Sequence, residues 1–159
     1  MNVHIRWMIR RDTPEVMAIE QAGFGRPKTE EEILAMLRRR NCIGMVAEQG
    51  ERVVGFMIYE LHKTSVRILD FAVHPDRRRM GAGAQMAAKL AGKLSSHRRT
   101  RLAIHVRETN LAAQLFFASQ GFRAVDVLRE HFDDTEEDAY AMVYAIEQAA
   151  PAMLDAPRW

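Results

Sequence analysis

The most constraining feature of the sequence is residues 67–91, where an apolar run is joined to a helical pattern by a basic loop that contains glycines. Residues 68–73 are mostly apolar and partly β-branched, which is typical of a buried strand. Pro75 ends this strand, because proline cannot donate to a sheet ladder. Apolar residues then recur at helical spacing between 86 and 94. The segment therefore predicts a strand, a loop and a helix, in that order.

The loop itself has the composition of an anion site. Three consecutive arginines, residues 77–79, are followed closely by Gly81 and Gly83. Glycine lets backbone N–H groups approach a ligand, and a helix N-terminus adds partial positive charge, so the loop favours phosphate or pyrophosphate. It is not a Walker loop, and Met86 stands where a dinucleotide fingerprint needs its third glycine. The alternative interpretation is a glycine turn beside a solvated arginine run.

Length and composition exclude several classes. A chain of 159 residues fits one domain with a core that needs neither disulfides nor metal. Cys42 is the only cysteine, and the histidines lack metal-ligand spacing, so we expect no metal. A net charge of +2 does not indicate nucleic-acid binding. Without a signal peptide or a membrane-length apolar run, we expect a cytoplasmic monomer or homodimer that binds neither nucleic acid nor membrane.

Apolar periodicity along the chain predicts the element order β-α-α-β-β-β-α-β-α-β-β. This order favours an α/β (α+β) fold, in which one mixed and mostly antiparallel sheet carries helices on both faces. We expect residues 1–147 to form the domain and residues 148–159 to form a loose tail. The predicted strands are residues 3–9, 43–48, 52–61, 68–73, 101–107, 122–128 and 140–146.

Two motifs carry a resemblance to a known family. The pattern Arg78-x-x-Gly81-x-Gly83, placed after a strand, resembles the coenzyme A pyrophosphate loop of the GCN5-related N-acetyltransferases (GNAT superfamily). Residues 104–123 resemble the last motif of the RimI-like ribosomal-protein alanine N-acetyltransferases. The resemblance implies one N-acetyltransferase domain that uses acetyl-CoA as co-substrate. It further implies direct transfer in a ternary complex to a protein or peptide N-terminal α-amine, with ribosomal proteins among the candidate acceptors.

The resemblance assigns coenzyme contacts to three segments. The central strand would bind the pantetheine arm through its backbone, with one N–H facing the thioester carbonyl as an oxyanion donor. The glycine loop would hold the pyrophosphate, and Asn110 would contact the coenzyme or only cap the following helix. The predicted coenzyme-binding residues are Phe71, Ala72, Val73, Arg78, Arg79, Met80, Gly81, Ala82, Gly83, Ala84 and Asn110.

Two positions depart from the RimI-like pattern. His105 stands where that pattern has a catalytic glutamate, and Phe117 stands where it has a tyrosine. Phenylalanine cannot donate a proton to the leaving thiolate. Some eukaryotic N-terminal acetyltransferases resemble this chain in carrying histidine at the strand position. His105 is therefore the candidate general base or water holder, because imidazole titrates near neutrality; the alternative is that it only fills a strand position.

Asp70 and Glu108 are the backup candidates for the base. Strand alternation places Asp70 on the face opposite Leu69 and Phe71, within the central strand. Glu108 follows the strand that carries His105, or simply faces solvent.

Two other functions remain open from the sequence. A small-molecule N-acetyltransferase for polyamines or aminoglycosides would favour an acidic cleft, for which the run 133–138 is the only candidate. A catalytically weak acyl-CoA-binding module is the second alternative, since both catalytic side chains of the RimI-like pattern are replaced.

Overall fold

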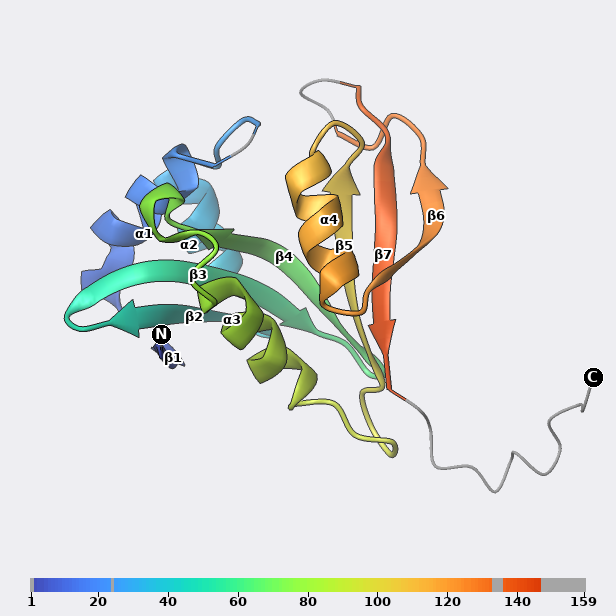
Figure 1. The fold of residues 1–159 in the computed structure, drawn as a ribbon, viewed down its shortest axis with the longest axis horizontal. Coiled ribbons are helices and arrows are strands. Elements are labelled where there is room, and N and C mark those ends of the chain that lie inside the picture. The colour runs from blue at the N-terminus through green and yellow to red at the C-terminus, as the bar shows by residue number, and fades with distance from the viewer. Residues whose placement is uncertain (1, 24, 133–135, 147–159) are drawn as a thin grey trace, which may run out of the picture.

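The architecture is that of one sheet with helices on two sides (Figure 1). The computed structural model describes residues 2–23, 25–132 and 136–146, so the predicted tail 148–159 and part of the acidic run lie outside the described residues. The sheet has seven strands in the order β1-β2-β3-β4-β5-β7-β6. The strands are β1 (His4–Trp7), β2 (Cys42–Gln49), β3 (Arg52–Leu61), β4 (Ser65–Val73), β5 (Arg101–Arg107), β6 (Arg123–Leu128) and β7 (Ala139–Ala145). The α-helices are α1 (Thr13–Gln21), α2 (Glu30–Arg38), α3 (Ala82–Ala91) and α4 (Leu111–Ser119).

The predicted fold class is confirmed. All neighbouring strands pair antiparallel except β4 and β5, which run parallel. A parallel pair needs a crossover, and here the crossover contains the glycine loop and α3. No helix in the described part of the chain is long and apolar enough to span a membrane.

Local signals in the sequence explain where the helices begin and end. Thr29 and Glu32 form the capping box of α2, with the Glu32 N–H donating to Thr29 Oγ1 at 3.1 Å and the Thr29 N–H donating to Glu32 Oε1 at 3.0 Å. Gly121 follows α4 with a φ of +94°, a left-handed conformation that glycine adopts without a Cβ penalty. Phe122 is then buried behind the end of α4.

Two apolar clusters lie on opposite faces of the sheet. One cluster joins α3 and α4 to the sheet and includes Met57, Met86, Leu90 and Phe117. The other joins α1 and α2 to the opposite face and includes Val16, Ile33, Phe56 and Ile58. The sheet is therefore covered on both sides, as predicted.

The two halves of the sheet separate between β4 and β5. Their pairing ends at Ile68 and Ile104, although both strands continue for several residues. Figure 1 shows β4 and β5 diverging from their shared start, with α3 and α4 beside the opening. Backbone groups on the facing edges of β4 and β5 are thus left for a ligand instead of a neighbouring strand.

A β-bulge corrects one prediction about β4. The register of β3 and β4 shifts so that Ile58 pairs with Asp70 while Tyr59 pairs with Ile68, which leaves Leu69 as the extra residue. Leu69 packs against the α1–α2 cluster, whereas Phe71 packs against the α3–α4 cluster. The prediction that Leu69 and Phe71 share a face is wrong, because simple alternation fails at a bulge.

Candidate active site

The glycine loop leaves the N-terminus of α3 open. Gly81 is the N-cap of α3 with a φ of +93°, and it offers no side chain to accept from the first helical N–H groups. Arg79 also has a positive φ, +64°, which is uncommon outside glycine and costs about 1 kcal/mol or more. The first N–H groups of a helix have no intrahelical partner, so those of Ala82, Gly83 and Ala84 can donate hydrogen bonds to an anion.

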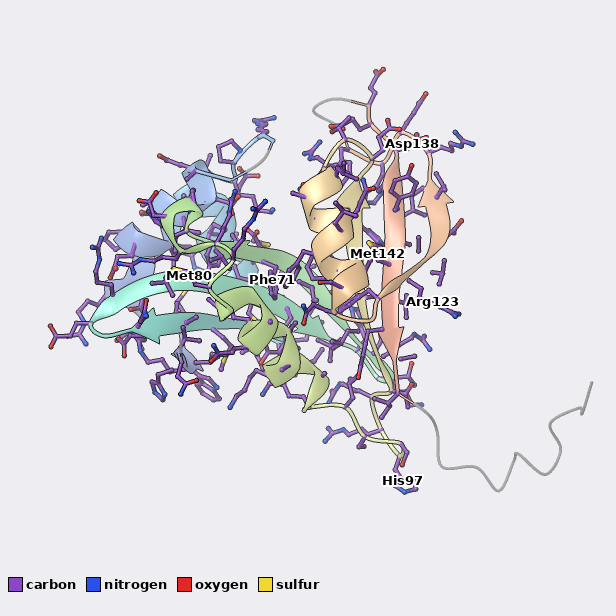
Figure 2. The ribbon with its side chains drawn as sticks, viewed as in Figure 1. Phe71, Met80, His97, Arg123, Asp138 and Met142 are labelled. Carbon is purple, nitrogen blue, oxygen red and sulfur yellow. The ribbon has the colours of Figure 1, made fainter. Side chains whose placement is uncertain are left out.

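Gly83 allows α3 to lie close to α4 and β4. A Cβ at Gly83 would lie 3.1 Å from two ring atoms of Phe116 and 3.6 Å from Val73 Cγ2. Figure 2 shows Phe71 between the ribbons of α3 and α4 and Met80 on the loop before α3. The glycine loop and the open edge of β4 are therefore adjacent. This arrangement fits a ligand whose pyrophosphate binds the loop and whose extended arm runs along β4.

The edge of β4 that faces the opening carries the backbone groups of Phe71 and Val73. The His74 N–H donates to Val54 O at 2.7 Å, so alternation along the ladder turns Phe71 and Val73 away from β3. The Phe71 N–H donates to Asp70 Oδ1 at 2.9 Å, and Arg78 Nε donates to Val73 O at 3.3 Å. A ligand here competes with these two local contacts for the same groups.

Asn110 caps α4. Its Oδ1 accepts from the Ala113 N–H at 3.1 Å, which is the alternative role that the sequence left open. This contact uses only the oxygen of the side-chain amide.

A cleft of about 390 Å³ lies at the point where β4 and β5 diverge. Its walls come from the segment between α1 and α2, the start of α2, β4, β5 and the segment after β6. It is lined by Arg26, Pro27, Lys28, Glu32, Arg67, Ile68, Leu69, His105, Arg107, His131 and Phe132.

His105 has two nitrogen partners in this cleft. Arg67 Nη2 lies 3.0 Å from His105 Nδ1, and His131 Nε2 lies 3.1 Å from the same atom. A guanidinium group only donates, so Nδ1 is the acceptor and the proton of the neutral imidazole is on Nε2. Partial burial, the Arg67 charge and His131 lower the pKa of His105 below its usual value, in that order of importance. His105 is therefore neutral at physiological pH.

This geometry defines what His105 can do. The neutral ring can hold a water molecule through Nε2–H, or accept a proton at Nδ1 once Arg67 and His131 have moved from that atom. Both roles predicted from the sequence are chemically available, and they differ in whether Arg67 and His131 must move.

Asp70 belongs to a second polar group, which lies under α1. Its Oδ2 is buried without a hydrogen-bond partner among the described residues, and Lys28 Nζ is 3.6 Å away. Burial and the nearby Glu20 carboxyl raise the pKa of Asp70 to about 8, against the opposing charge of Lys28. A carboxyl with this pKa is protonated at neutral pH, so Asp70 is a poor proton acceptor there.

Replacing Asp70 with asparagine should make the fold less sensitive to pH. A carboxyl whose pKa is higher in the folded state stabilises the fold at low pH, and this contribution is lost as the pH rises from about 4 to about 8. We expect Asp70→Asn to raise the melting temperature at pH 8.5 by roughly 4–8 °C, which corresponds to about 2 kcal/mol, and to change it little at pH 5.

Asp126 supplies the matched control for thermal unfolding at the two pH values. Its Oδ1 accepts from the next N–H at 2.8 Å, the same local contact that Asp70 makes, but Asp126 is exposed. Asp126→Asn should leave both melting temperatures unchanged. An equal gain at pH 5 and pH 8.5 for Asp70→Asn would contradict the assigned pKa.

The remaining candidates lie outside the cleft. Glu108 is exposed, and its Oε1 accepts from the Asp138 N–H at 3.3 Å. Phe117 is buried among the rings of Phe71, Phe116 and Phe122. Within the described ranges, no three His, Cys, Asp or Glu side chains are grouped so that they could hold a metal ion.

Sequence reasoning missed several residues of the cleft. Arg67 and His131 contact His105 from 38 and 26 positions away in the chain. Arg26 and Lys28 reach the cleft from the segment before α2. The pairing of β4 with β5, the path of the segment after β6 and the path of the segment before α2 bring these side chains together, and none of them leaves a local pattern in the sequence.

An open helix N-terminus beside a split sheet, with a histidine in the adjoining cleft, fits an acyl-coenzyme A-dependent transferase. Residues 7–122 match the model of the acetyltransferase (GNAT) family, so the chain belongs to this family. It is an acetyl-CoA-dependent N-acetyltransferase, which transfers acetyl to an amine.

The chain is similar to individual proteins of known function or structure. The alanine N-acetyltransferase of ribosomal protein bS18 from Escherichia coli K12 is 26% identical over 137 residues, which cover 85% of this chain and 92% of that protein. The crystal structure of the Escherichia coli enzyme superposes with a TM-score of 0.80 at 25% identity, covering 94% of this chain and 97% of that one. The crystal structure of Ard1 from Thermoplasma volcanium superposes with a TM-score of 0.82 at 26% identity, covering 93% of this chain and 100% of that one.

Proposed function

We propose that this chain acetylates the N-terminal α-amine of a protein or peptide by direct transfer in a ternary complex. The observation that carries the proposal is the position of His105 in an open cleft where β4 and β5 diverge, beside the edge that the coenzyme arm would occupy. The similar Escherichia coli protein acts on the alanine of ribosomal protein bS18, which supports a protein N-terminus as the acceptor class. A ribosomal protein is the candidate acceptor within this class.

The residues would divide the chemistry as follows. The amine nitrogen attacks the thioester carbonyl carbon, and the negative charge that forms on oxygen is stabilised by a backbone N–H on the open edge of β4. The carbon–sulfur bond then breaks and the coenzyme leaves as its thiolate. The proton lost from the amine passes to His105 Nδ1 or to water held by its Nε2–H.

A weak base is sufficient for an α-amine acceptor. The α-amino group has a pKa of about 7.7–8, so roughly a tenth is neutral at pH 7, whereas lysine at about 10.4 is almost wholly protonated. A histidine whose pKa is lowered is a weak base, so it suits an α-amine acceptor better than a lysine side chain.

The same cleft disfavours a polycationic small molecule. Arg26, Lys28, Arg67 and Arg107 all line it, and Glu32 is its only carboxylate among the described residues. Two of the three described carboxylates of the acidic run are already paired, Glu137 with Arg107 at 3.1 Å and Asp138 with Arg129 at 3.1 Å, and the third, Glu136, is exposed and does not line the cleft. A polyamine would therefore meet repulsion of like charges.

Acetyl-CoA turnover on three acceptors separates these functions. A peptide with a free N-terminus should be acetylated, whereas the same peptide with a blocked N-terminus and spermidine should react far more slowly. Faster turnover of spermidine would support the small-molecule alternative. Coenzyme binding without turnover of any acceptor would instead support the catalytically weak binding module.

A further inference from the structure

The acceptor cleft has an excess of positive charge. Four of its lining residues are Arg or Lys, and one is a carboxylate. That carboxylate, Glu32, already accepts from the Thr29 N–H at 3.0 Å in the capping box of α2. An acceptor that enters the cleft therefore meets cations whose charge Glu32 only partly offsets.

Two of the four cations lie close to carboxyl groups that do not line the cleft. Arg107 bonds to Glu137 at 3.1 Å and stacks on the Phe132 ring at 4.0 Å. Lys28 lies 3.6 Å from Asp70, whose raised pKa leaves that carboxyl largely protonated at neutral pH. The charge of Arg107 is thus offset by the Glu137 carboxylate, whereas the charge of Lys28 is offset little by the protonated Asp70.

Arg67 and Arg26 have no carboxylate partner in hydrogen-bond or ion-pair distance among the described residues. Within the described ranges, the one polar contact of the Arg67 guanidinium is His105 Nδ1, a neutral acceptor. Arg26 is exposed at the rim of the cleft, next to the start of α2. A half-buried guanidinium that is paired only with a neutral ring favours an incoming carboxylate, which it can bind through two parallel N–H groups.

We propose that the acceptor carries a carboxylate side chain directly after its N-terminal residue, and that Arg67 binds this carboxylate with Arg26 at the rim. The inference rests on the proposed acetylation of a protein N-terminus. It assigns Arg67 and Arg26 to the recognition of an acidic N-terminal sequence.

The contact with His105 gives this recognition a catalytic consequence. Arg67 Nη2 occupies the nitrogen that would accept the amine proton. A carboxylate that draws Arg67 away leaves His131 as the remaining neighbour of His105 Nδ1 and removes a nearby positive charge, which makes the imidazole a stronger proton acceptor. The acidic residue should therefore raise kcat as well as lower KM.

Three peptides that differ only at the second residue test the proposal. They begin with alanine followed by glutamate, glutamine or lysine, and kcat and KM are measured for each with acetyl-CoA. A hydrogen-bonded charge pair corresponds to about a tenfold or larger preference for glutamate over glutamine in kcat/KM, and the lysine peptide should be slower still.

Variants identify the residues that produce the preference. Arg67→Gln should bring the ratio of the glutamate and glutamine peptides close to one, and Arg26→Glu should reduce it and favour the lysine peptide. Arg123→Gln is the matched control, because Arg123 is an exposed arginine on β6 away from the cleft (Figure 2). Because each ratio is taken within one variant at one pH, an effect of Arg67 on the pKa of His105 cancels.

The possible outcomes separate this inference from the proposed function. Equal turnover of the three peptides by the unmodified protein would overturn the acidic preference and leave N-terminal acetylation intact. A preference that persists in Arg67→Gln and Arg26→Glu would overturn the assignment to these arginines. Turnover of none of the peptides would overturn the proposed function, and the inference with it.

Discussion

Replacing His105 with alanine is expected to lower kcat about 100-fold while the affinity for acetyl-CoA stays nearly unchanged, since a positioned base commonly contributes 10²–10⁴-fold. The side chain of His105 comes from β5 and lines the cleft, whereas the predicted coenzyme contacts lie on β4, in the glycine loop, at the start of α3 and at Asn110 before α4. Removing the imidazole therefore removes the proton acceptor, or the water that it holds, without changing the coenzyme cradle.

The pH dependence of kcat should identify the ionising group. Because the pKa of His105 is lowered, the fall in kcat that its protonation causes should lie below about 6.5, the usual histidine value, and should be separate from the rise near about pH 8 as the acceptor amine loses its proton. Arg67→Gln removes a positive neighbour and should move this fall to higher pH. The fall should be absent from whatever activity remains in His105→Ala.

His97 provides the control for this experiment. It is an exposed histidine between α3 and β5, far from the cleft (Figure 2). His97→Ala should keep full activity with the same pH profile. Full kcat in His105→Ala on a good peptide would remove His105 from the mechanism and direct attention to ordered water as the proton acceptor.

A second large effect, on the affinity for acetyl-CoA, is expected from replacing Gly83. Gly83→Val is expected to weaken acetyl-CoA binding by about ten- to a hundredfold, because hydrogen bonds to charged groups contribute about 1.5–3 kcal/mol and a bulky side chain would crowd the anion at the start of α3. The added Cβ would point between Phe116 and Val73, beside the open edge of β4. Calorimetric titration with acetyl-CoA measures the change in affinity.

Packing against Phe116 must be separated from loss of the anion site. At 3.1 Å, an added Cβ requires the Phe116 ring to shift by a few tenths of an ångström, so Gly83→Val also lowers stability to some degree. Combining Gly83→Val with Phe116→Leu gives room to the new side chain, and the melting temperature should partly recover while affinity remains low. Gly92→Ala, at the other end of α3, is the matched control and should bind normally. Unchanged affinity in folded Gly83→Val would contradict the loop assignment.

Most of the fold was predictable because its signals are local. The run 101–107 alternates strictly and became β5 with the predicted bounds, and the Thr29–Glu32 capping box starts α2. One exception is Leu69, where a β-bulge breaks the alternation, and another is the start of β4, which lies at Ser65 instead of residue 68. A bulge depends on how two strands pair, so the sequence of one strand does not reveal it.

The candidate site was predictable only in part, for the same physical reason. The pattern of Gly81 and Gly83 is contiguous and led directly to the start of α3. By contrast, the contact between Arg67 and His105 joins two strands across their parallel pairing. The electrostatic environment of the histidine, and the positive charge of the cleft, follow from tertiary structure alone.

The most direct test of the central claim is to locate the acetyl group on a single product. A peptide with a free N-terminal alanine, an acidic second residue and an internal lysine is incubated with acetyl-CoA and this protein, and tandem mass spectrometry then assigns the added acetyl group. Transfer to a protein N-terminus predicts one acetyl group on the α-amine and an unmodified lysine. Acetylation of the lysine side chain with a free α-amine would contradict it.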